Sequence, residues 1–190
     1  MNPFARTILG YHGCTKTFAD RLLSGKLKVD QWTMSRNKHD WLGEGIYFWE
    51  HSPARALRWA RENCAKRSSQ PAVVGAVLQL GTCFDLTNEE NTRNLAVAFT
   101  QVREAYEAVG KDLPRNRGTD RDLKGRYRDC LVVNYYLQQV AELEYETVRA
   151  AFAEGAPVYD GSMLSEESHI QIAVRDRRCI LGLFRPTYGL

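Results

Sequence analysis

The chain has 190 residues, of which 44% are hydrophobic, 26% charged and 11% aromatic, and its net charge is +3. This balance is typical of a globular protein, and it argues against a disordered chain and against a coiled coil. A net charge of +3 neither identifies nucleic acid as a partner nor excludes it. We expect a single domain over residues 1–190, long enough to bury its own core.

The five cysteines are scattered along the chain, and none has the CxxC or Cys/His spacing of a zinc site. We therefore expect free thiols, no bound metal and a cytoplasmic location. The N-terminal segment lacks the long apolar region of a signal peptide, and no apolar run approaches the roughly 20 residues of a membrane helix. We expect no membrane partner.

The first third of the chain is predicted to alternate between strands and helices. Gly25 indicates a helix stop, and the pair Ser52-Pro53 indicates a helix start. The elements that we expect, in chain order, are a strand at 7–10 leading into YHG, a helix within 15–26, a loop at 29–40, a strand at 45–49 and a helix from 53 to about 66.

The rest of the chain is predicted to form a strand at 72–81, a helix within 91–110, a loop at 111–128, a helix within 129–140 and strands at 145–152, 168–174 and 179–184. The strand at 72–81 is almost entirely apolar, which favours the interior of a sheet. The loop at 111–128 is rich in Lys and Arg, and we call it the basic segment. It is interpreted as a solvated segment or as a contact for a nucleic-acid backbone or a pyrophosphate. Strands at both ends with helices between them predict an α+β fold with a mainly antiparallel sheet.

The stretch WLGEGIYFWE at 41–50 contains two glycines but does not fit a phosphate-binding loop. A Rossmann fingerprint needs a third glycine, a preceding strand and a following helix, and a Walker loop needs Gly-Lys-Ser/Thr. Strand alternation predicts two opposite sets: Gly45, Tyr47 and Trp49 on one face, Ile46 and Phe48 in the core. A tyrosine beside a bare glycine predicts a slot for a flat aromatic ligand; simple packing of Tyr47 under a helix is the alternative.

Two other stretches place polar groups on strands. In YHGC, His12 and the Gly13 amide are able to contact a ligand, although a structural histidine is the alternative. In EESHIQIAV, a polar row opposes an apolar row, which predicts the lip of a polar cleft or a solvated edge strand. This polar row contains Glu167, His169 and Gln171. Cys14 beside His12 permits a Cys–His nucleophile pair, but no third orienting residue is identifiable.

The order of these pieces, with YHG first, GIYF after a loop and a late strand carrying an acid or amide, resembles the ADP-ribosyltransferase superfamily. It is most similar to the His-Tyr-Glu branch, which includes poly(ADP-ribose) polymerases and diphtheria-like toxins, and to small bacterial domains of that branch. The resemblance spans nearly the whole chain and implies an ADP-ribosyltransferase-like split antiparallel sheet with flanking helices. NAD is implied as the co-substrate.

The resemblance also implies residue roles. His12 would hydrogen-bond the NAD ribose, the Gly13 backbone would hold the nicotinamide amide, and Tyr47 would stack on the nicotinamide ring. Three further residues complete the expected NAD contacts: Tyr11, Asn37 and Gly45. The catalytic residues that we expect are His12, Tyr47 and Gln171.

The third motif departs from the family pattern, because the family's glutamate aligns best with Gln171. Glutamine accepts a hydrogen bond but carries no charge and cannot act as a general base. The loss of a negative charge beside the cation that develops in the transition state would raise the barrier by several kcal/mol, by analogy with the roughly 3–4 kcal/mol cost of one lost oxyanion donor. Elongation of an ADP-ribose chain is therefore not expected, whereas single transfer stays open if another acid substitutes. The candidate acids are Glu167 first, then Glu44, Glu50 and Asp40.

The expected function is that of an NAD-dependent mono-ADP-ribosyltransferase acting on a protein or nucleic-acid acceptor. A role as a bacterial toxin or defence effector, restrained by an antitoxin or immunity protein, is the expected context. Two alternatives stay open: a catalytically weak module that binds NAD or ADP-ribose, and an NAD glycohydrolase that uses water as the acceptor.

Overall fold

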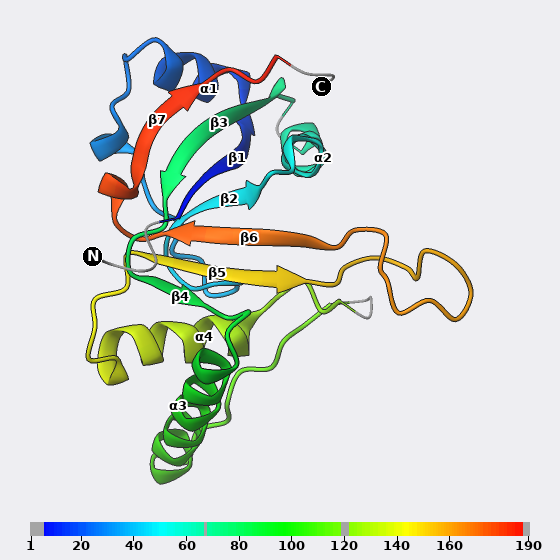
Figure 1. The fold of residues 1–190 in the computed structure, drawn as a ribbon. Helices are drawn as coiled ribbons and strands as arrows, with labels where there is room; N and C mark the ends of the chain where they lie inside the picture. Colours follow the sequence, from blue (N-terminus) through cyan, green and yellow to red (C-terminus); the bar gives the residue numbers. More distant parts are fainter. Residues whose placement is uncertain (1–5, 67, 119–121, 188–190) are drawn as a thin grey trace.

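The computed structural model describes residues 6–66, 68–118 and 122–187, and over these residues the fold is α+β (Figure 1). The strands are β1 (Thr7–Thr15), β2 (Ile46–Glu50), β3 (Pro71–Gln79), β4 (Cys83–Asp85), β5 (Thr147–Phe152), β6 (His169–Val174) and β7 (Ile180–Phe184). The α-helices are α1 (Lys16–Leu23), α2 (Pro53–Ala65), α3 (Glu89–Ala108) and α4 (Tyr127–Tyr135), and a π-helical turn (Tyr136–Val140) continues α4. The described helices include none with the length and apolar character to cross a bilayer.

The seven strands form one open sheet in the order β4-β5-β6-β2-β1-β3-β7. The pair β4–β5 is parallel and the other pairs are antiparallel, so the predicted α+β class with a mainly antiparallel sheet is confirmed. β1 pairs with β3 along its whole length, but it pairs with β2 only through Gly10↔Glu50 and Tyr11↔Trp49. We call the point beyond Tyr11 and Trp49, where these two strands stop pairing, the β1–β2 divergence.

Different helices cover the two faces of the sheet. α1 packs on one face, over a core that includes Ile46 and Phe48, which are 2% and 0% exposed as predicted. α2 packs on the other face around Trp49, and α3 and α4 cover that face around Val148 and Ala173. In Figure 1, α1 lies at the β7 end of the sheet, and α3 and α4 lie at the β4 end. Side-chain alternation therefore directs Tyr47 away from α1.

Local signals explain where the helices begin and end. The Thr15 hydroxyl accepts from Phe18 N at the start of α1, and the Asn88 side chain accepts from Glu90 N at the start of α3. Gly25 adopts a φ of +74° just after α1, which suits its predicted role as a stop. The Ser52 side chain makes no capping bond, so the Pro at the first turn accounts for the start of α2.

β6 is an interior strand, because β2 and β5 pair with its two sides. The edge-strand interpretation of its polar row is therefore wrong. His169 and Gln171 are 8% and 7% exposed, so these two members of the polar row are buried, whereas the Glu167 side chain is 27% exposed. β4, with only three residues, is too short for an alternation pattern, and the sequence did not predict it.

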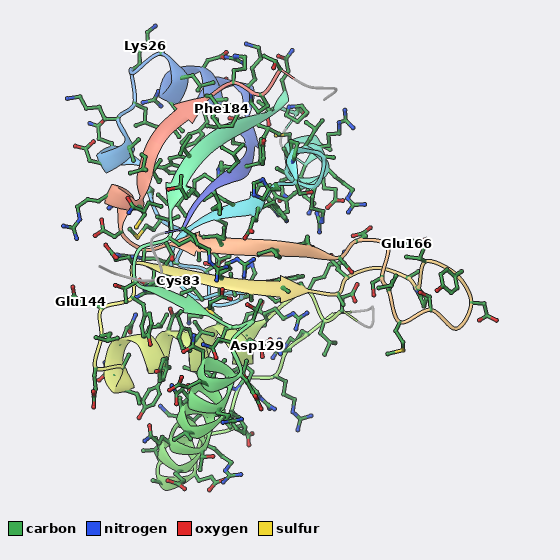
Figure 2. The ribbon with its side chains drawn as sticks, in the orientation of Figure 1. Lys26, Cys83, Asp129, Glu144, Glu166 and Phe184 are labelled. Carbon is green, nitrogen blue, oxygen red and sulfur yellow. The ribbon has the colours of Figure 1, made fainter. Side chains whose placement is uncertain are left out.

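The described residues of the basic segment that precede α4, 111–118 and 122–126, make several contacts with α4. Asp129, labelled in Figure 2 near the start of α4, accepts from Asn116 Nδ2 at 2.8 Å and from Arg126 at 3.3 Å. Arg128 Nε donates to Pro114 O at 2.9 Å. The first residues of α4 thus lie inside the predicted loop, whose residues 119–121 are outside the described part of the chain.

Candidate functional site at the β1–β2 divergence

His12 lies at the β1–β2 divergence, partly buried among aromatic rings. Its Nδ1 lies 2.8 Å from the Tyr47 carbonyl oxygen, and its ring packs against Trp32 and Phe48 with centroids 4.9 and 5.8 Å apart. Burial lowers the pKa of His12 to about 4, although the hydrogen bond to Tyr47 opposes this shift. A carbonyl oxygen only accepts, so Nδ1 carries the proton and Nε2 keeps a lone pair. His12 is therefore a neutral acceptor that suits a ligand hydroxyl.

The Gly13 peptide points toward β2 rather than β3. Three backbone hydrogen bonds establish the alternation along β1: Leu80 N donates to Arg6 O, Lys16 N to Gln70 O, and His51 N to Leu9 O. Even-numbered residues of β1 therefore bond to β3, and odd-numbered residues face β2. Gly13 is odd-numbered and lies beyond the last β1–β2 pair, so its N–H and C=O point into the β1–β2 divergence.

α2 presses on Gly13 from the face that carries Tyr47. A Cβ atom on Gly13 would lie 2.2 Å from Ala56 O and 3.2 Å from Trp59 Cε3. Glycine is therefore needed here for helix packing as well as for any ligand contact. Trp59 is 39% exposed, and its ring lies 5.8 Å from that of Trp49. The sequence prediction missed Trp59, for which the available signal was its helical spacing from Ala56.

Two hydrogen bonds hold the hydroxyl of Tyr47 in place. It donates to Gly43 O at 2.6 Å and accepts from Leu42 N at 2.8 Å. Burial, with a contribution from Asp40, raises the pKa of Tyr47 well above its usual value, so the hydroxyl stays protonated. A Cβ atom on Gly45 would lie 3.0 Å from Ala173 Cβ. The slot predicted beside Gly45 is thus corrected: Ala173 of β6 fills this space, and glycine permits close strand packing.

Gln171 is buried on the same face as Tyr47, in register with Trp49 on β2 and Ala150 on β5. Its Nε2 lies 3.2 Å from Nε2 of His169. The third-motif side chain is therefore engaged with a neighbouring histidine, two residues away on the same strand face.

Glu154 is a buried carboxylate close to this pair. Its Oε2 lies 2.7 Å from Arg55 of α2 and 3.7 Å from His169 Nδ1, and its Oε1 lies 3.0 Å from Lys124 Nζ. Burial raises the pKa of Glu154, but the hydrogen bonds from Arg55 and Lys124 outweigh it and bring the net pKa below its usual value. The carboxylate is therefore ionised. A lone glutamate in a polar connection gave no signal in the sequence.

The side chains of the two remaining predicted NAD contacts, Asn37 and Tyr11, do not lie beside that of His12. The Asn37 side chain donates to Ser35 Oγ at 2.8 Å and to Asp40 Oδ1 at 3.2 Å, within a turn. Tyr11 lies on the α2 face, with its ring 6.0 Å from that of Phe184. The positions of the Asn37 and Tyr11 side chains are therefore explained by contacts within the protein.

The carboxylates of the predicted substitute acids are all paired with other groups of the protein. The ion pairs are Glu167 with Arg58 at 3.0 Å, Glu44 with Arg36 at 3.5 Å and Glu50 with Arg149 at 2.6 Å. Asp40 accepts from Asn37 N at 2.8 Å. Burial raises the pKa of Cys14 to about 12, so its thiol is protonated and a Cys–His nucleophile pair is not supported.

The structure brings the three motifs onto neighbouring strands, in the order β6-β2-β1, but their side chains do not share one face. His12 packs on the α1 side, whereas Tyr47 and Gln171 lie on the other side. A hollow of about 670 Å³ lies elsewhere, among residues 112–117 and Arg128. Within the described ranges, no group of three or more His, Cys, Asp or Glu side chains is arranged to hold a metal ion.

Comparison with known proteins found no matching family model, no matching curated protein and no matching solved structure.

Proposed function

We propose that the chain is an NAD-dependent mono-ADP-ribosyltransferase, which transfers ADP-ribose from NAD to a protein or nucleic-acid acceptor and releases nicotinamide. The supporting observation is that the three motifs, which are far apart in sequence, occupy the adjacent strands β1, β2 and β6. His12 lies on the α1 side of the sheet, and Tyr47 and Gln171 lie on the other side, so a common ligand would lie in the β1–β2 divergence, where both sides are within reach. In this proposal, the β1–β2 divergence is the split of an ADP-ribosyltransferase-like sheet.

The groups at the β1–β2 divergence complement parts of NAD. Nε2 of His12 accepts a hydrogen bond from a ribose hydroxyl, since Nδ1 donates to Tyr47 O. The N–H and C=O of Gly13 match the oxygen and the amino group of a carboxamide. The Tyr47 ring, fixed through its hydroxyl, supplies an apolar side for the nicotinamide.

Transfer breaks the bond between the ribose C1′ and the nicotinamide nitrogen, and the bonding electrons leave with nicotinamide. A bond from C1′ to the acceptor nucleophile forms, and the acceptor proton passes to solvent. Gln171 accepts a hydrogen bond from the ribose but does not take this proton. The acceptor must therefore be a good nucleophile, and a single transfer is expected.

One observation favours a second function, that of an NAD- or ADP-ribose-binding module with little turnover. Gln171 is uncharged, and its amide nitrogen is engaged by His169. Hydrolysis of NAD with water as the acceptor is a third outcome, which nicotinamide release in the absence of any acceptor would identify.

The direct test incubates the purified protein with labelled NAD and a whole-cell lysate, with and without nuclease treatment. Transfer of label to a macromolecule is expected, and nuclease sensitivity of the product distinguishes a nucleic-acid acceptor from a protein. His12→Ala should abolish the transfer, whereas the matched control His39→Gln, at an exposed histidine, should not. Binding of NAD without transfer or nicotinamide release would favour the binding module instead.

A toxin role predicts that expression of the chain arrests bacterial growth. His12→Ala and Tyr47→Ala should each relieve the arrest, because each removes a proposed NAD contact. Growth curves of induced cultures, with equal expression checked on blots, provide the measurement. Arrest by these two variants to the same extent as by the unaltered chain would contradict toxicity by ADP-ribose transfer.

A further inference from the structure

The contact between Gln171 and His169 is buried and specific, and the proposed transfer does not account for it. The two nitrogens, Gln171 Nε2 and His169 Nε2, lie 3.2 Å apart. Both side chains are more than nine-tenths buried. Both project from β6 on the same face of the sheet as Tyr47 of β2. Water therefore has little access to either side chain, and their hydrogen-bond partners come mainly from the protein.

The tautomer of His169 follows from its other ring nitrogen. His169 Nδ1 lies 2.8 Å from the backbone oxygen of Glu167, and this oxygen only accepts. The carboxylate of Glu154, 3.7 Å from the same Nδ1, also favours a proton there. Nε2 therefore presents a lone pair, to which the Gln171 amino group donates. This fixes the orientation of the amide and directs Gln171 Oε1 away from His169.

Burial, helped by two nearby arginines, keeps the imidazole of His169 neutral. Burial lowers the pKa of His169, Arg55 and Arg58 lower it further, and the Glu167 backbone and the Glu154 carboxylate oppose them. The ring is flanked by Trp41 and Phe152, with centroids 6.1 and 5.7 Å away. A neutral ring in this setting keeps the direction of its hydrogen bond to Gln171 at neutral pH.

We propose that His169 and Gln171 form a matched pair, in which His169 is a positioning residue that directs Gln171 Oε1 toward a ribose hydroxyl of NAD. This inference rests on the proposed function and deepens it. In Gln171→Glu, the carboxylate would face the unprotonated Nε2 of His169, and because both groups are hydrogen-bond acceptors they would repel each other. The carboxylate would be tolerated once His169 took up a proton, and the imidazolium would then cancel its charge. Gln171→Glu alone therefore does not raise turnover.

The first test needs no activity. Two-dimensional ¹⁵N NMR of the histidine rings, with His169 assigned by its absence in His169→Gln, reports the tautomer and the titration of this residue. The expected result is an Nδ1–H tautomer in the unaltered protein, with a pKa below 6.5, and a pKa above 6.5 in Gln171→Glu. An Nε2–H tautomer, or a His169 titration that Gln171→Glu leaves unchanged, would overturn the pairing.

The second test measures kcat and KM for nicotinamide release. His169→Leu removes the acceptor and should lower kcat about tenfold, the equivalent of one hydrogen bond, while His169→Gln offers a carbonyl acceptor and should recover most of the loss. Gln171→Glu should be no faster than the unaltered protein, and His169→Leu combined with it should be faster than Gln171→Glu alone. The exposed-site variant His39→Gln is the control. A gain in kcat from Gln171→Glu alone, or full activity of His169→Leu, would overturn the proposal.

The two tests separate this inference from the proposed function. If the unaltered protein binds NAD without turnover, transfer is refuted, and the pair is then judged by NAD affinity, which His169→Leu should weaken about tenfold. If the protein neither binds nor cleaves NAD, the proposed function and the ligand role of the pair both fail, whereas the NMR result still decides whether the pair exists. Melting temperatures of all variants identify those that fail to fold.

Discussion

His12 connects the candidate site to the stability of the fold through a single proton. Its pKa is lowered from 6.5 to about 4 by burial, so the unfolded chain takes up this proton at a higher pH than the folded chain does. The stabilisation linked to His12 is complete above pH 6.5 and is lost as the pH falls toward 4. It amounts to roughly 3–4 kcal/mol at most, because each unit of pKa shift corresponds to roughly 1.4 kcal/mol.

We therefore predict that the free energy of unfolding falls more steeply between pH 6.5 and 4.5 in the unaltered protein than in His12→Gln. The glutamine amide is able to donate to Tyr47 O as His12 does, but it does not titrate. Urea denaturation at several pH values measures both slopes, and the difference removes the contribution of the other titrating groups. Equal slopes would show that His12 is not held neutral in the folded protein.

Gly13 provides a second prediction at the scale of one residue. In Gly13→Ala, the new Cβ would lie 2.2 Å from the backbone oxygen of Ala56, so α2 must move away from β1. We expect a loss of roughly 2–4 kcal/mol of unfolding free energy, in the range of overpacked interiors and strained backbones. Gly182→Ala, on β7, is the matched control, since nothing lies within 4 Å of its added Cβ. Denaturant titration would refute the packing role if both variants were equally stable.

At the scale of elements, Glu154 fastens α2 and the segment before α4 to the end of the sheet. Its carboxylate binds Arg55 of α2 and Lys124 of the basic segment, and Asp122 accepts from Gly155 N beside it at 3.1 Å. Glu154→Gln would leave Arg55, whose side chain is 11% exposed, without its closest counter-charge. Unpairing a buried charge is strongly destabilising, whereas Lys124 is half exposed and stays hydrated.

We predict that Glu154→Gln lowers the unfolding free energy by roughly 3 kcal/mol and speeds proteolysis of the segment 111–126 in the folded state. Glu166→Gln is the control, because Figure 2 shows Glu166 in the β5–β6 connection, away from the sheet. This control should change stability by less than about 0.5 kcal/mol. An unchanged cleavage rate in Glu154→Gln would mean that other contacts hold the segment.

The elements show what the sequence predicts well and what it does not. Periodicity and caps located the long helices and all strands except β4, because these signals are local. Alternation also placed Phe48 in the core and put His169 and Gln171 on one strand face. It did not show that β6 is an interior strand, since pairing with β2 and β5 joins segments that are distant in the chain. For the same reason, Glu154, Arg55 and Trp59 were not predicted to lie near the motifs.

At the scale of the whole molecule, the sheet consists of two groups of strands, β4-β5-β6-β2 and β1-β3-β7, joined by the short pairing of β1 with β2. β1 pairs with β3 over nine positions and with β2 over two, so the ladder on the β3 side is continuous and the one on the β2 side ends at Tyr11. The amides on the two sides of β1 therefore have different environments. By the alternation along β1, the His12 and Cys14 amides face β3, whereas the Gly13 amide faces the β1–β2 divergence.

We predict that the Gly13 amide exchanges with solvent deuterium faster than the amides of His12 and Cys14, and that NAD slows its exchange at least about tenfold. Tenfold slowing corresponds to about 1.4 kcal/mol, within the range of one hydrogen bond, which the Gly13 N–H makes with the carboxamide in the proposed function. Exchange followed by NMR with and without NAD reports each amide separately, and the β3 amides provide the internal reference. If NAD protects all β1 amides equally, it stabilises the whole fold by mass action without contacting Gly13. Protection confined to Gly13 and its surroundings would locate nicotinamide at the β1–β2 divergence even in a protein that binds NAD without turning it over.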